Sequence, residues 1–178
     1  MTFTSNSKSM QLLPKSLNEA KDLVYDCCNL DFSSFVKENE SEEYSACRFD
    51  LNAKKICFRD AKITPTKTGQ FVTLWKRNSN GIIEPFDASD LIDFVIVNVR
   101  KEDNWGQFIF PKKIVLEKGI FSTQNKEGIR GTRVYPPWDE TTSKQAQKTQ
   151  KWQLDYFFSF SDENEIDFNR IREILNTN

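Results

Sequence analysis

The chain has 178 residues, of which 38% are hydrophobic and 29% are charged, a composition typical of one soluble globular domain with its own core. It contains no histidine, which excludes Ser-His-Asp triads, Cys-His dyads, histidine-based zinc sites and nucleases with a histidine general base. No apolar run approaches the ~18 residues that span a bilayer, and the polar start "MTFTSNSKSMQ" lacks the apolar core of a signal peptide. We therefore expect a cytoplasmic protein with no membrane partner.

Charge is distributed unevenly along the chain, although the net charge is only −1. Residues 15–50 hold four Lys or Arg and nine acids, whereas residues 54–77 hold seven Lys or Arg and one acid. Two further basic blocks follow, with six cations against two acids in residues 111–133 and three against none in residues 141–153. Each run alone would suit a solvated surface. If the three blocks converge in the fold, they form an electropositive face for an anionic partner.

The chain is predicted to begin with a leader followed by a helix. We expect residues 1–14 to be flexible and residues 15–178 to form a single domain. Ser16 and Glu19 have the spacing of a capping box, which predicts a helix of roughly 13 residues that begins at Ser16. The stretch "KENESEE" (37–43) is typical of a polar, acidic loop.

Apolar residues alternate with other residues in segments 47–51, 56–61 and 71–75, which predicts three strands. The segments "NAKK" (52–55) and "TPTKTG" (64–69) between them are turn signals, so we expect antiparallel hairpins. The chain also has four cysteines without any CxxC spacing, which favours reduced structural thiols over metal ligands.

The second half of the chain alternates between strands and helices. "DFVIVNV" (93–99) is nearly continuous and rich in β-branched residues, which predicts a central strand covered on both faces. "WGQFIFP" (105–111) predicts a further strand, and Pro111 and Gly119 bracket a short predicted helix. Residues 141–158 contain no Gly or Pro and predict a long helix, and Ser161 is the expected cap of a last one. This order predicts an α/β fold with one mixed sheet flanked by helices.

Four blocks of sequence carry a resemblance to a known family. They are "CFRDAKITPTKTGQFVTLWKR" (57–77), "GQFIFPK" (106–112), "RGTRVYPPWD" (130–139) and "KQAQKTQKWQLDYF" (144–157). With these blocks in this order, the chain resembles the MepB-like family over roughly residues 47–158. The resemblance implies a restriction-endonuclease-like or tRNA-endonuclease-like architecture, and it implies no particular activity, because fold does not decide function.

The implied fold suggests a Mg²⁺-dependent nuclease as one hypothesis. Such an enzyme needs two carboxylates that hold the ion and a Lys that acts with it, and Asp50, Asp60 and Lys62 are the candidates, with Asp50 and Asp60 as metal ligands. Glu19 would add a carboxylate from the first helix. Acid-x-Lys triplets also arise by chance, and Asp60 falls on a variable position of the family motif Phe-Arg-x-Ala-Lys-x-Thr-Pro. The alternative interpretation is that Asp60 simply pairs with a neighbouring cation such as Arg59 or Lys62.

The second hypothesis is that the basic blocks bind DNA, RNA or another polyanion. Arg grips phosphate bidentately and Lys supplies a point charge, while aromatic rings such as Trp75, Tyr135, Trp138 and Trp152 can stack on bases. Phe71 and Trp75 share a strand face, however, and we expect both to pack in the core rather than to stack on bases. The predicted anion-binding residues are Arg59, Lys62, Lys67, Lys76, Arg77, Lys112, Arg130, Arg133 and Lys148.

A third hypothesis is a protein-interaction module. The segment "YPPWD" (135–139) is aromatic and rich in proline, and the Lys/Gln face of the helix after it would suit an acidic partner. We prefer polyanion binding on a nuclease-like fold, with or without catalysis. No cofactor is expected except Mg²⁺ in the nuclease hypothesis. Whether the protein is an enzyme and which oligomeric state it adopts stay open.

Overall fold

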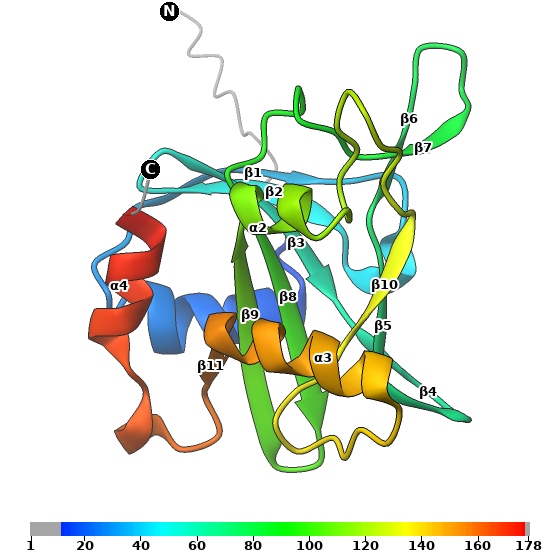
Figure 1. Ribbon diagram of the computed structural model, residues 1–178. Helices are drawn as coiled ribbons and strands as arrows, with labels where there is room; N and C mark the ends of the chain where they lie inside the picture. Colours follow the sequence, from blue (N-terminus) through cyan, green and yellow to red (C-terminus); the bar gives the residue numbers. More distant parts are fainter. Residues whose placement is uncertain (1–11, 177–178) are drawn as a thin grey trace, which may run out of the picture.

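A six-stranded mixed β-sheet forms the centre of the molecule (Figure 1). The computed structural model describes residues 12–176. Across the sheet the strands lie in the order β1 (Phe32–Lys37), β2 (Cys47–Leu51), β3 (Lys54–Asp60), β8 (Phe94–Lys101), β9 (Asn104–Pro111) and β11 (Phe157–Ser159). β3 and β8 are parallel, and each of the other neighbouring pairs is antiparallel.

β8 is the central strand that the sequence predicts. It lies between β3 and β9, and its first six residues are buried. Phe94 and Ile96 enter the core on one face of the sheet, whereas Val95 and Val97 enter the core on the other. This alternation follows from the two-residue period of a strand, and it explains why a strand covered on both faces is apolar at nearly every position.

Helices cover both faces of this sheet. One core lies against α1 (Lys15–Ala20), its π-helical continuation η1 (Lys21–Tyr25) and α4 (Phe168–Asn176). The opposite core lies beneath α2 (Lys112–Glu117) and α3 (Lys144–Gln153). In Figure 1, α3 crosses in front of β8 and β9, and the blue helix α1 lies behind them. Three single 3₁₀ turns complete the helical elements, η2 (Glu42–Tyr44), η3 (Leu154–Tyr156) and η4 (Glu163–Glu165).

A second, smaller sheet packs on the α3 side of the molecule. The chain leaves β3 after Asp60 and enters β4 (Lys62–Thr64), which pairs with β5 (Lys67–Thr73) in an antiparallel hairpin. β5 also pairs with β10 (Gly131–Val134), and Val72 and Val134 join the core beneath. β6 (Trp75–Arg77) and β7 (Ile83–Pro85) form a separate two-stranded ribbon.

The mixed α/β class predicted from the sequence is confirmed, together with the strands at 47–51 and 105–111 and the first predicted hairpin. The second hairpin has its turn where predicted, but its first strand is β4 and not the strand predicted over 56–61, which stays in the main sheet beside β2 and β8. The leader predicted over residues 1–14 lies outside the described residues except for its last three. Within residues 12–176, none of the helices has the length and apolar character needed to cross a membrane.

Several predicted boundaries differ from the structure. Pro14 is the N-cap of α1, and the hydroxyl of Ser16 donates to Asp60 instead of capping the helix. The helix α3 ends at Gln153, because one turn of η3 leads into the edge strand β11. The strand predicted over residues 71–75 is divided at Leu74, whose amide donates to the carbonyl of Arg130.

Candidate nucleic-acid interface

Asp50 and Asp60, the predicted metal ligands, lie at opposite ends of the β2–β3 hairpin. Asp50 is in register with Lys55 beside the turn, whereas Asp60 is the last residue of β3. Asp60 lies five positions after Lys55 along the extended strand, which places their Cα atoms about 16 Å apart. Two ligands of one Mg²⁺ ion each lie about 2.1 Å from it, so these two carboxylates do not fit a shared ion.

Both carboxylates have protein partners of their own. Asp50 Oδ2 lies 2.8 Å from Lys55 Nζ. Asp60 accepts hydrogen bonds from the Ser16 hydroxyl at 2.8 Å and from Asn98 Nδ2 at 3.0 Å. These bonds tie α1 and β8 to the end of β3, so Asp60 stabilises the packing of the helix on the main sheet.

Lys62 faces a different neighbourhood from Asp60. Lys62 belongs to β4 of the second sheet, and its Nζ lies 4.8 Å from the ring centre of Tyr44 in η2, whereas Asp60 faces α1 and β8. The turn at Ala61 separates the two side chains because the chain changes sheet there. In the described part of the chain, no three His, Cys, Asp or Glu side chains gather closely enough to hold a metal ion.

Arg59 is the most buried of the predicted anion-binding residues, with 0% of its surface exposed. Its guanidinium donates to both carboxylate oxygens of Glu38, at 2.9 and 3.1 Å. It also donates to the main-chain carbonyls of Phe58 and Thr73, which belong to β3 and β5. Arg59 therefore joins the two sheets and cannot contact a partner at the surface.

Four other predicted residues have acidic or carbonyl partners. Lys76 Nζ lies 2.8 Å from the carboxylates of both Asp87 and Asp90. Hydrogen bonds lower the pKa of Asp87 to about 2, with the largest contribution from Lys76 and the next largest from the Ser89 hydroxyl. The remaining partners are Glu40 for Arg77, Glu127 for Arg130 and the main-chain carbonyl of Asp90 for Lys112. We call Lys76, Arg77 and Arg130, which contact carboxylates, the paired cations, and Lys112, whose partner is a neutral carbonyl, belongs to neither group.

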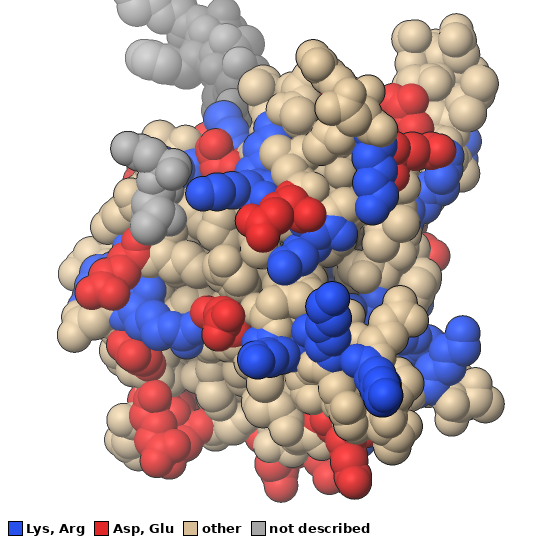
Figure 2. Space-filling view, viewed as in Figure 1, with Lys and Arg blue, Asp and Glu red and all other residues tan. Residues whose placement is uncertain are grey.

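The remaining four predicted residues, Lys62, Lys67, Arg133 and Lys148, form no ion pair with any described residue. The same holds for Lys144 and Lys151, which share a face of α3 with Lys148 because they are spaced four and three residues from it. We call these six residues the unpaired cations. Figure 2 shows Lys and Arg side chains along α3 and over the adjoining β4–β5 hairpin.

A cleft of about 380 Å³ lies between the second sheet and the start of α3. We call it the α3 cleft. Its lining contains two cations and no carboxylate, and it includes hydroxyl groups from the helix and the sheet. The lining residues used below are Lys67, Phe71, Arg133, Tyr135, Ser143 and Thr149.

Two aromatic rings of the α3 cleft pack closely against glycines. A Cβ at Gly131 would lie 2.6 Å from the Phe71 ring, and a Cβ at Gly69 would lie 2.7 Å from the Tyr135 ring. Gly69 also has a φ of +83°, which a glycine adopts without strain. Phe71 and Tyr135 are half-buried, and neither belongs to the buried core clusters. Phe71 therefore belongs to the surface of the second sheet, and its predicted core role is corrected.

Arg133 is held rigidly beside the Phe71 ring. Its guanidinium donates to the hydroxyl of Thr64 at 2.6 Å and to the carbonyls of Thr68 and Gly69 at 3.4 and 3.2 Å. The guanidinium carbon lies 5.9 Å from the centre of the Phe71 ring. These neutral acceptors fix the position of the group without cancelling its charge.

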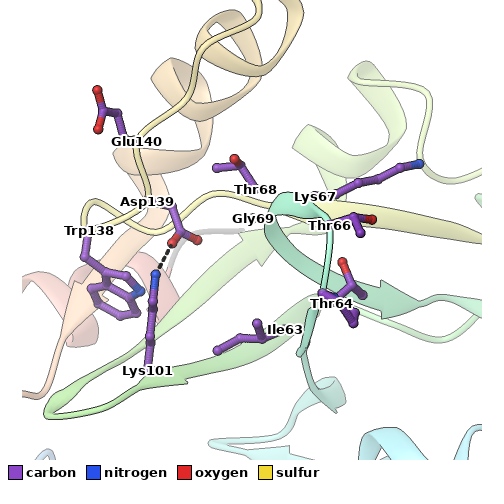
Figure 3. Close-up of a pocket in the computed structure, with 11 residues that line it drawn as sticks. Ile63, Thr64, Thr66, Lys67, Thr68, Gly69, Lys101, Trp138, Asp139 and Glu140 are labelled. Carbon is purple, nitrogen blue, oxygen red and sulfur yellow. Dashed lines mark hydrogen bonds and ion pairs between the residues drawn. The ribbon is translucent and has the colours of Figure 1, made fainter.

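A second cleft, of about 530 Å³, lies on the other side of the hairpin turn (Figure 3). It contains the carboxylates of Asp139 and Glu140, and Lys101 Nζ lies 3.5 Å from Asp139 Oδ1. In Figure 3, Lys101 points toward Asp139, whereas the side chain of Lys67 extends away from both. This cleft therefore contains both signs of charge, two lysines and two carboxylates, and Lys67 is directed away from its acids.

The sequence contains a signal for two of the residues that our anion-binding prediction omitted. Lys144 and Lys151 are spaced from Lys148 by four and three residues, so the sequence predicts that all three lysines share one face of the helix. The seating of Phe71 on Gly131 has no comparable signal, because the two residues are sixty positions apart and meet only through the pairing of β5 with β10.

The fold and the cleft define a mixed α/β protein with a basic, aromatic surface site. The model of the MepB-like family matches residues 38–159, and the chain therefore belongs to the MepB-like family. A crystal structure of MepB is similar, with 33% sequence identity, a TM-score of 0.73, and coverage of 84% of this chain and 99% of the MepB chain.

A bacterial homing endonuclease shows a weaker likeness, with 12% sequence identity and a TM-score of 0.45 over 83% of this chain and 93% of the endonuclease chain. The search of curated proteins found no match.

Proposed function

We propose that the protein binds nucleic acid, or another polyanion, through the face formed by the β4–β5 hairpin, β10 and α3. The observation that carries this proposal is that Lys67 and Arg133 line a cleft without a carboxylate, while three further cations that form no ion pair with a described residue, Lys144, Lys148 and Lys151, lie on α3, the helix that borders this cleft. An unpaired Lys or Arg gains most from a phosphate, because no internal ion pair has to be broken first.

The Mg²⁺-dependent nuclease alternative receives no support from the geometry. Asp50 and Asp60 lie at opposite ends of the β2–β3 hairpin, and Lys62 faces Tyr44 rather than Asp60. These residues do not fit one metal ion, so we derive no catalytic step from them. The protein-interaction alternative is also unsupported, since Pro136 and Asp139 of "YPPWD" are buried and Trp138 packs against the core.

We also propose that the protein works in the cytoplasm. The supporting observation is that all four cysteines are free thiols. Burial raises the pKa of the Cys47 thiol and of the Cys57 thiol, which keeps both protonated and unreactive. Free, protonated thiols in the core suit a reducing compartment.

The test is a titration of the protein against a fluorescently labelled DNA or RNA oligonucleotide, with binding followed by anisotropy at several salt concentrations. We expect an affinity that falls steeply with salt, because bound cations release counterions from phosphate. The double variant Lys67→Gln/Lys148→Gln should lower the slope of log K against log salt by about 2, or about 1 for each lost contact. The control Arg77→Gln/Arg130→Gln removes the same charge from paired cations and should leave the slope near its original value.

Equal effects of the two double variants would show that net charge, rather than this face, governs binding. Failure of the wild-type protein to bind DNA, RNA or heparin at low salt would refute the proposal itself.

A further inference from the structure

We infer that the α3 cleft holds an unpaired nucleotide, so that the protein prefers single-stranded nucleic acid over duplex. This inference rests on the nucleic-acid binding proposed above and assigns the class of ligand. It follows from three features of the cleft, namely its two rings, its fixed charge and its size.

The two rings offer stacking surfaces that are already in place. Phe71 and Tyr135 are both half-buried in the lining of the cleft, and their rings contact Gly131 and Gly69 at distances that leave no room for a Cβ. A ring that cannot retreat into the core loses little freedom when a base stacks on it. Base stacking on aromatic rings is the usual source of affinity for single strands, and it tolerates any sequence because every base has a flat face.

The charges of the cleft suit the phosphate of the same nucleotide. Arg133 is fixed by Thr64 and two carbonyls beside the Phe71 ring, whereas Lys67 has no partner among the described residues and remains free to move toward an oxygen. Ser143, whose hydroxyl oxygen accepts the Ala146 amide as the N-cap of α3, and Thr149 of α3 also line the cleft. The cleft thus places rings, cations and hydroxyls next to one another, which matches the base, the phosphate and the sugar of one nucleotide.

The shape of the cleft favours a single strand. Its volume of about 380 Å³ lies at the lower end of the range of small-molecule pockets, so it can enclose one nucleotide but not a duplex. Bases inside a duplex are stacked on one another and paired, and they present no free face to a protein ring. A base enters this cleft only from a single strand or after it has been flipped out of a duplex at a cost in free energy.

The experiment compares three labelled ligands with the wild-type protein at one salt concentration. They are a deoxythymidine decamer, the same decamer in duplex form, and a decamer of abasic sites that keeps every phosphate. We expect the single strand to bind at least about fivefold more tightly than the abasic strand, because stacking is worth 1–3 kcal/mol for each base. We expect it to bind more tightly than the duplex as well. Equal affinity for the thymidine and abasic strands overturns the inference.

Ring variants test the location. Phe71→Leu and Tyr135→Leu keep an apolar side chain over each glycine but remove the flat face, and each should weaken binding of the thymidine decamer by at least about fivefold. Each should leave the salt slope unchanged. Trp75→Leu is the matched control, because Trp75 is a half-exposed ring that lies outside the cleft and should not affect binding. Thermal unfolding of each variant confirms that it is folded.

The outcomes separate the two proposals. If the charge variants weaken binding while both ring variants leave it unchanged, the proposed function stands and the cleft inference fails. If duplex binds as tightly as the single strand and the abasic strand, the same conclusion follows. If none of the three ligands binds at low salt, the inference fails, and the proposed function fails with it when RNA and heparin do not bind either.

Discussion

Two groups of cations look alike in the sequence of this protein, but in the fold one group contacts carboxylates and the other does not. The paired cations lie on or near the β6–β7 ribbon, where Asp87, Asp90 and Glu40 face them. The unpaired cations lie on the β4–β5 hairpin, β10 and α3, where the adjoining cleft contains no carboxylate. A count of charges along the chain places Lys67 and Lys76 in one basic block. In the fold, Lys76 forms ion pairs with Asp87 and Asp90, whereas Lys67 forms none with a described residue and is available to a partner.

The difference teaches that local charge runs do not locate a binding face. Lys76 lies eleven and fourteen residues before Asp87 and Asp90, its two nearest acids, and Arg77 and Glu40 are thirty-seven apart. A window of sequence around residue 76 therefore shows the cations without the acids that neutralise them. Four predictions test whether the paired cations maintain the fold and the unpaired cations bind the partner.

The largest expected effect is on stability and concerns Arg59, the most deeply paired cation. Arg59→Met removes a fully buried guanidinium and leaves the Glu38 carboxylate without its bidentate partner. We expect the free energy of unfolding in urea to fall by about 3–5 kcal/mol, the cost of breaking a buried ion pair.

The double variant Arg59→Met/Glu38→Gln provides the control for this prediction. It should lose less stability than the sum of the two single variants, because the second change removes the carboxylate that the first leaves unpaired. Additive losses would mean that the pair does not act as a unit. Arg48, which also bonds Glu38, remains in place in every variant.

The second prediction concerns the contact between Gly131 and the Phe71 ring on the proposed binding face. Gly131→Ala introduces a Cβ 2.6 Å from the ring and 3.3 Å from the carbonyl oxygen of Val72. Overpacking of this kind costs about 1–3 kcal/mol, so thermal unfolding should shift to lower temperature. In a background that carries Phe71→Ala, Gly131→Ala should cost much less stability, since the contact at 2.6 Å is gone and only the contact at 3.3 Å with Val72 remains. If the cost stays the same, the contact between ring and glycine would not be the source of the strain.

The sequence predicts the layers of this fold better than it predicts the site. The β-branched run at 93–99 and the alternation at 105–111 are local signals, and the strands they predict lie at the centre of the sheet. The end of α3 was missed because Phe157–Ser159 becomes a strand only by pairing with β9, about fifty residues earlier in the chain.

The site depends even more on distant pairings. The sequence suggests a division of roles within residues 59–77, but it assigns Arg59 to the surface and Phe71 to the core. The structure reverses both, because Arg59 meets Glu38 across two strands and Phe71 meets Gly131 across β10. Neither contact leaves a periodic pattern that a reading along the chain could detect.

The third prediction compares one paired cation with one unpaired cation, for both stability and binding. Lys76→Met breaks contacts with two acids at 2.8 Å and leaves Asp87 and Asp90 facing each other, so we expect a loss of about 1 kcal/mol in the free energy of unfolding. Oligonucleotide affinity should change little. Lys148→Met should change stability by less than about 0.5 kcal/mol and weaken binding. If both variants moved both readouts equally, the division into paired and unpaired cations would have no functional meaning.

The smallest expected effect is the response of the paired group to acid. The pKa of Asp87 is lowered to about 2 by the hydrogen bonds from Lys76 and Ser89, whereas an unfolded chain has a value near 3.9. A lowered carboxyl pKa stabilises the folded state above the unfolded value, and this stabilisation is lost as the pH falls toward 2. Because Asp87 is partly exposed, the contribution is below about 1 kcal/mol. The difference in unfolding free energy between wild type and Asp87→Asn should therefore be largest above pH 5 and shrink by pH 2. The difference between wild type and Lys148→Met should stay constant over the same range, because no described carboxylate pairs with Lys148.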